Sequence, residues 1–133
     1  MNPHTSVFSF GRASALQKGQ LLDITPAAAA ACIGMPSAVS ERLWRKLAEN
    51  NPLTPSDPRA LSLCWSVFLF VNTKTYTRER QGRFSRTVWF NTKVLGRSVD
   101  VKAIAHGGDR GEPVMTLLCA DEPDPFDDLN KPV

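Results

Sequence analysis

The residues best suited to chemistry lie together in a glycine-rich segment, 106–112, with the sequence HGGDRGE. His106 could act there as a base beside backbone amides that hold an anion. Amides that bind anions are usually ordered at the start of a helix, whereas the residues after Glu112 have the composition of a strand. We therefore interpret His106 as a residue at the end of a strand, before a hairpin loop.

Carboxylates and known catalytic motifs give no stronger signal. Asp100, Asp109 and Glu112 could form a cluster for a metal ion, but so few hard ligands indicate a solvated turn instead. The chain contains no GxxxxGK[ST], GxSxG or HExxH motif, and no GxGxxG between a strand and a helix. We therefore predict no enzyme activity, no cofactor and no bound metal.

The cysteines indicate a compartment rather than a metal site. Cys32, Cys64 and Cys119 are odd in number, widely spaced and set among apolar residues, with no CxxC pair. Two histidines are too few to complete a zinc site around them. Three buried thiols fit a reducing environment, so we predict a cytoplasmic protein. The longest apolar run, 60–71, is too short to span a bilayer, and no membrane partner is expected.

Charge is distributed unevenly along the chain. Segment 74–102 holds eight basic residues and two acids, with aromatic residues between them, whereas 121–128 holds five acids and no base. Basic residues neutralise phosphates and aromatic rings stack on bases, so the segment could bind nucleic acid directly. It would equally suit an acidic protein surface, or serve only for solubility. The residues expected to contact a partner are Tyr76, Arg78, Arg80, Arg83, Arg86, Trp89, Asp121, Asp124, Asp127 and Asp128.

Helix signals fill the first half of the chain. Cap residues, prolines and hydrophobic spacing predict helices at 12–17, 25–32, 36–49 and 57–71. The helix at 36–49 is supported by Val39, Leu43 and Leu47, which recur at a spacing of four. The helix at 57–71 is apolar nearly all round, a pattern typical of a buried helix.

Strand signals fill the second half. Alternation with period two predicts strands at 84–94, 98–106 and 113–120, with turns at Leu95-Gly96 and at the glycine-rich segment. The last of these strands is apolar on both faces, so we expect it to be central. On the strand 98–106 we expect the face containing Lys102 and His106 to point outward. The polar stretch 72–82 is expected to be a mobile loop.

Together these elements predict an α+β fold with N-terminal helices packed on a three- to four-stranded antiparallel sheet. The fourth strand would be the short extended piece at 21–24. Helix 61–71 should cross the sheet face lined by Val88, Phe90, Val99 and Val101. A length of 133 residues predicts a single domain, placed at 6–120, followed by an acidic, flexible tail at 121–133.

Residues 14–25, 34–44 and the late hairpin resemble a family of small proteins of unknown function from bacterial plasmids, phages and integrative elements. The family pattern combines a short helix, the motifs DG-L-VDVT and P-AV-T---W around an alanine-rich turn, and a hairpin K-----GDDGEPV-T. This chain departs from the pattern at Gln20 and Arg110. The matching hairpin residues are Lys102, Gly107, Gly108, Asp109, Gly111, Glu112, Pro113, Val114 and Thr116.

The resemblance implies an accessory protein of a mobile genetic element. Small proteins of that origin often act against host defences, so the leading hypothesis is a non-enzymatic inhibitor that binds a host defence complex, in the manner of an anti-CRISPR protein. In that role the acidic tail could imitate phosphates in a nucleic-acid channel. The alternatives are a small nucleic-acid-binding regulator that uses segment 74–102, and an enzyme with an unfamiliar site near His106 and Asp109. The oligomeric state is not predicted.

Overall fold

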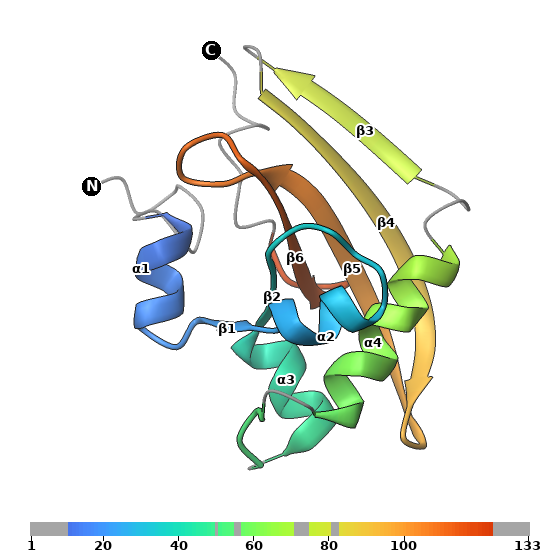
Figure 1. Cartoon of the computed structure of the whole chain (residues 1–133). Coiled ribbons are helices and arrows are strands. Elements are labelled where there is room, and N and C mark those ends of the chain that lie inside the picture. The colour runs from blue at the N-terminus through green and yellow to red at the C-terminus, as the bar shows by residue number, and fades with distance from the viewer. Residues whose placement is uncertain (1–10, 50, 55–56, 71–74, 81–82, 124–133) are drawn as a thin grey trace.

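A sheet of six strands forms the frame of the protein (Figure 1). The computed structural model describes residues 11–49, 51–54, 57–70, 75–80 and 83–123. All neighbouring strands are antiparallel except β2 and β6, which are parallel. In spatial order the strands are β1 (Leu21–Asp23), β2 (Ser37–Ser40), β6 (Pro113–Cys119), β5 (Arg97–Gly107), β4 (Arg83–Val94) and β3 (Thr75–Arg80).

The helices of the described chain cover the sheet unequally. They are α1 (Arg12–Gln17), α2 (Thr25–Ala30), α3 (Glu41–Ala48) and α4 (Pro58–Phe70). Helices α2, α3 and α4 share one large core with the sheet, whereas α1 packs at the β1 edge in a separate small cluster built on Ala15, Leu21 and Ala38. Leu21 and Ala38 alternate with the large-core residues Leu22 and Val39, so α1 lies on the opposite face of the sheet. Below, the face under α2, α3 and α4 is called the helix face, and the other the α1 face.

Helix α4 begins and packs as the sequence predicts. Asp57 accepts a hydrogen bond from the backbone N–H of Arg59 at 3.0 Å and forms an ion pair with its guanidinium at 2.8 Å. That side-chain hydrogen bond holds the pKa of Asp57 below its usual value. Leu63 and Val67 then pack over the expected sheet residues, and the rings of Phe70 and Phe90 stack with centroids 5.4 Å apart. The α+β class and this central packing are therefore confirmed.

The sheet itself is larger than expected. The prediction of three or four antiparallel strands is wrong because the sheet has six strands and one parallel pair. Strand β6 is central, as expected, and strands β4 and β5 pair through the turn at Leu95 and Gly96, where both residues have positive φ. Such turns match the natural twist of a hairpin.

Two added strands arise where the sequence suggested other structure. The expected helix 36–49 begins only at Glu41, because Ser40 is its N-cap and accepts a hydrogen bond from the Leu43 N–H at 3.1 Å. Residues 37–39 pair instead with β6, so Val39 is buried in a strand rather than on a helix stripe. The expected loop 72–82 contains β3, which pairs with β4 along its whole length. The remainder of that loop lies outside the described residues.

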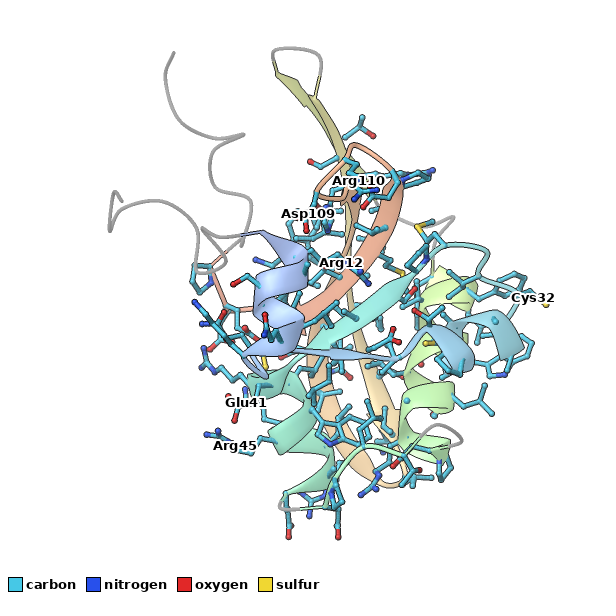
Figure 2. The ribbon with its side chains drawn as sticks, turned by 60° about the vertical axis from the view of Figure 1, so that its left-hand side comes forward. Arg12, Cys32, Glu41, Arg45, Asp109 and Arg110 are labelled. Carbon is cyan, nitrogen blue, oxygen red and sulfur yellow. The ribbon has the colours of Figure 1, made fainter. Side chains whose placement is uncertain are left out.

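Burial also differs from expectation at three polar or thiol side chains. Lys102 and His106 are 8% and 5% exposed, because the α1 face of β5 is covered rather than open to solvent. Cys32 is exposed at the end of α2, where Figure 2 shows its side chain pointing away from the protein, whereas Cys64 and Cys119 are buried. In the part of the chain that the structure describes, no helix is long and apolar enough to cross a membrane.

Candidate functional site

The glycine-rich hairpin between β5 and β6 brings His106 into a structural network. Its Nε2 lies 2.8 Å from the Thr116 hydroxyl, and its Nδ1 lies 2.8 Å from the Gly107 carbonyl oxygen. A carbonyl oxygen only accepts hydrogen bonds, so in the neutral ring Nδ1 carries the proton and Nε2 accepts from Thr116. Both nitrogens are engaged and the ring is buried, which supports the interpretation of His106 as a structural residue.

Asp109 holds the start of α1 from far away in the sequence. Its two carboxylate oxygens accept hydrogen bonds from the N–H groups of Arg12 and Ala13, at 2.7 and 2.9 Å. Figure 2 shows Asp109 beside Arg12 at that helix end. The N-cap residue Gly11 makes no side-chain cap of its own, so Asp109 supplies the acceptor that a helix start requires. These hydrogen bonds hold the pKa of Asp109 below its usual value.

Glu112 closes the hairpin loop through its side chain and its backbone carbonyl. Its carboxylate accepts from the Arg110 N–H at 2.9 Å, and its carbonyl oxygen accepts from the Gly108 N–H at 2.6 Å. A Cβ at position 108 would collide with the Glu112 carboxylate where it now lies, so a larger residue there would displace that side chain. Gly111 has a φ of 81°, a conformation that favours glycine. Across the described residues, no group of three or more histidine, cysteine or acidic side chains could hold a metal ion.

Lys102 and the turn after β6 also hold the fold together. Lys102 donates from Nζ to the Glu122 carbonyl oxygen at 2.6 Å. The Glu122 carboxylate accepts from the Ser40 hydroxyl at 2.6 Å and from the Cys119 N–H at 2.8 Å. These contacts fix the turn after β6 to β2 and β5. Asp121 forms an exposed ion pair with Arg42 at 2.9 Å, so the first two acids of the expected tail contact the domain.

The basic residues of segment 74–102 do not form one surface in the described structure. Arg97 is bound to the end of α3 through Glu49 and the Lys46 carbonyl oxygen, and Lys102 is buried. Arg86 and Lys93 are exposed, but they lie seven positions apart on β4 and therefore on opposite faces of the sheet.

The expected contact residues are therefore spread over the molecule. Arg86 is on the helix face of β4, the exposed Trp89 is on its α1 face, and Asp121 follows the far end of β6. Tyr76, Arg78 and Arg80 lie in β3 and Arg83 begins β4, where the backbone pairing is described but the side chains are not. Asp124, Asp127 and Asp128 lie outside the described residues. The partner role of this set stays a prediction.

Among the described residues, large apolar side chains are exposed together on the outer side of α4. Trp65, Phe68 and Leu69 are 42%, 46% and 70% exposed. Their spacing of three and four residues places them on one side of the helix. The Trp65 and Phe68 rings meet edge to face with centroids 5.7 Å apart. We call these three residues the α4 apolar face. Its exposure corrects the expectation that the whole helix is buried.

An apolar cavity of about 130 Å³ opens beside this face. Its described walls come from the loop after α2, from the end of α4, and from three strands of the sheet. Phe68 and Arg86 at the opening are exposed, whereas Val88, Ala103 and Met115 at the base are buried. The residues that line it are Ile33, Met35, Val67, Phe68, Arg86, Val88, Ala103, Ala105 and Met115.

Sequence reasoning identified Arg86 in this site but missed the rest. The signal was present in α4, whose second apolar side is left exposed by the helices and strands that the structure describes. Comparisons with protein-family models, with curated proteins and with solved structures give no match. The family resemblance therefore stays a prediction, and the site rests on its geometry.

Proposed function

We propose that the protein acts by binding another protein through the α4 apolar face, and that it is not an enzyme. The exposure of Trp65, Phe68 and Leu69 on one side of α4, with Phe68 also lining a cavity, is the observation that carries this proposal. Contiguous apolar surface of this kind usually marks an interaction site, and aromatic residues contribute most to interface energies. A non-catalytic role is supported by the hydrogen bonds of His106, Asp109 and Glu112, which serve the fold.

The resemblance to mobile-element proteins predicts what the partner is. On that basis we propose a host defence complex as the target, with the protein acting as a stoichiometric inhibitor. Nothing in the fold itself selects this partner over another protein. The test must therefore identify the partner and locate its contact surface in the same experiment.

The experiment is capture of partners from a host lysate by the tagged chain, with and without nuclease, followed by mass spectrometry. Leu69→Ser removes an exposed apolar side chain from the α4 apolar face. Leu95→Ser is a matched control, because Leu95 is 65% exposed but lies in the β4–β5 turn. We expect a protein that survives nuclease treatment, is lost with Leu69→Ser and is retained with Leu95→Ser.

Two other outcomes would contradict the proposal. If partners disappear with nuclease, the chain binds nucleic acid, and the alternative function gains support. If Leu69→Ser and Leu95→Ser capture the same protein equally well, the contact surface lies elsewhere. Arg78, Arg80 and Arg83 in the β3–β4 hairpin would then be the next residues to replace.

A further inference from the structure

We propose that the cavity beside α4 receives one large apolar side chain of the protein partner, and that an acidic residue next to that side chain pairs with Arg86. This inference rests on the proposed function and specifies the chemistry of the partner. The predicted ligand is a polypeptide segment in which a residue such as Phe or Leu neighbours Asp or Glu. The cavity supplies the apolar contact and Arg86 supplies the charge.

The base of the cavity is built by the pairing of three strands. Arg86 is opposite Ala105, which is opposite Met115, and in the next row Val88 is opposite Ala103. Cross-strand neighbours share a face of the sheet, so these residues form a continuous surface under the end of α4. The two alanines leave a hollow, whereas nearer the other end of β5 Val99 and Val101 fill the core.

The size of the cavity suits a single side chain. Apolar cavities of roughly 150 Å³ stay dry and accept a molecule the size of benzene, and this one measures about 130 Å³. Every lining residue except Arg86 is apolar. A polar or charged group placed there would lose its hydrogen bonds to water without replacement. An apolar ring or branched chain would instead gain contacts with Val67, Val88 and Met115.

Arg86 gives the opening a charge preference. In the described structure its guanidinium has no hydrogen bond or ion pair, unlike Arg42, Arg45, Arg59 and Arg97, which all have acidic partners. An unpaired guanidinium beside apolar surface favours a carboxylate, and Arg–carboxylate pairs are among the stronger hydrogen-bonded contacts. A lysine or arginine on the incoming segment would be repelled, which would restrict the choice of partner.

The surface around the cavity favours a protein over a small metabolite. Trp65 and Leu69 are exposed but do not line the cavity. A metabolite held in the cavity would leave both side chains in water. A polypeptide segment that inserts one side chain would cover them with its neighbouring residues. Buried anchors surrounded by contacts that exclude water are typical of protein interfaces.

The first test uses a fragment that combines both features, 3-phenylpropionate, with NMR of the ¹⁵N-labelled full chain. We expect shifts of amide resonances at 33–35, 67–68, 86–88 and 103–105. Propionate, which lacks the ring, should cause none of them. The neutral 3-phenylpropanamide should bind about threefold or more weakly, since it cannot form the charge-assisted contact. Equal binding of acid and amide would overturn the role of Arg86, and absence of shifts at these residues would overturn the cavity.

The second test uses variants of the site with matched controls. Ala105→Leu fills the hollow and should abolish fragment shifts, whereas Ala29→Leu adds the same groups at an exposed position of α2. Ala105→Val is a smaller change that keeps the test valid if the leucine variant does not fold. Arg86→Gln should remove the preference for acid over amide. Lys93→Gln, on the other face of β4, should leave it unchanged.

Different results would contradict the proposed function and the proposed role of the cavity. If Leu69→Ser abolishes partner capture but Ala105→Leu and Ala105→Val do not, the protein-binding function stands and the cavity is not the anchor site. If the fragment binds the cavity but Leu69→Ser leaves capture unchanged, the function through α4 is wrong and the cavity takes a small carboxylate instead. Loss of capture with Leu69→Ser and with Ala105→Val supports both.

Discussion

The β5–β6 hairpin and the outer side of α4 contrast in what their composition suggests and what their structure does. The hairpin contains a histidine, two acids and three glycines within seven residues, a composition that suggests a site. In the structure each polar group of His106, Asp109 and Glu112 described above is engaged in holding the hairpin, or α1, in place. On its outer side helix α4 presents Trp65, Phe68 and Leu69, residue types that suggest a core, yet these side chains are exposed.

The contrast shows that the type of a residue does not by itself indicate its role. The role depends on whether the residue already has hydrogen-bonding or packing partners within the chain. A polar group that has found its hydrogen-bond partners inside the chain has little left to offer a ligand. An apolar group without a neighbour still loses free energy to water, and a second molecule can recover it. Unsatisfied groups, whether apolar as in Leu69 or charged as in Arg86, are therefore better guides to function here than catalytic-looking composition.

Thiol reactivity should give the largest measurable difference, and it tests whether α4 has one buried side. Burial raises the pKa of Cys64, on the inner side of α4, to about 12, and burial with the nearby Glu122 raises the pKa of Cys119 to about 11. Cys32 is exposed. With a thiol reagent in native buffer near pH 8, Cys32 should react at least about 100-fold faster than the other two, because the thiolate is the reacting species. Equal rates before unfolding would show that the inner side of α4 is open.

The α4 apolar face should affect binding strongly and stability weakly. Phe68→Ser and Leu69→Ser should weaken partner binding by roughly tenfold or more, as expected for residues at the centre of an interface. The free energy of unfolding should change by less than about 0.5 kcal/mol for Leu69→Ser, since the side chain is already 70% exposed. Urea titration and a binding titration on the same samples measure both quantities. A large loss of stability would mean that the face is part of the core.

Thr116→Val should show the opposite pattern, with stability lost and binding kept. The substitution removes the hydroxyl that is hydrogen-bonded to the buried His106 Nε2, and the loss of that buried hydrogen bond should cost about 1–3 kcal/mol. Thr116→Ser keeps the hydroxyl and serves as the control, with a smaller cost from the lost methyl group. Urea unfolding measures the difference. If Thr116→Val abolished binding while leaving stability intact, the hairpin would belong to the working surface after all.

Elements whose sequence signals lie within a few neighbouring residues could be predicted from the sequence. The Asp57-Pro58 start of α4, the β4–β5 turn at Leu95-Gly96 and the central, doubly apolar β6 are all predicted and confirmed. Strand β2 was missed because its four residues continue a helical spacing, and only the distant partner β6 makes them a strand. Parallel pairing between distant strands gives no recognisable sequence pattern within either strand.

The candidate site depends on contacts between segments that are far apart in the sequence. Asp109 and Arg12 are separated by 97 positions. The local sequence around either residue therefore gave no indication that Asp109 caps α1. The exposure of α4 could not be predicted either, because apolar composition shows that a surface needs covering but not whether the chain covers it. The cavity exists only where Ala103 and Ala105 come to lie under Phe68 and Met35.

The smallest expected effect concerns Asp109, which decides whether the hairpin serves as a clamp for α1. Asp109→Ala should lower the free energy of unfolding at neutral pH by about 1–2 kcal/mol, the usual value of a helix N-cap. The folded-state pKa of Asp109 is lowered, so its contribution is present above the unfolded-state value near 3.8 and is lost as pH falls through the lower folded-state pKa. The difference between wild type and variant in urea should therefore shrink at acidic pH. Asp121→Ala is the control, because its ion pair with Arg42 is exposed and should contribute less than about 1 kcal/mol. If the two variants behaved alike at every pH, Asp109 would be an ordinary surface acid, and the hairpin would again be open to a role in binding.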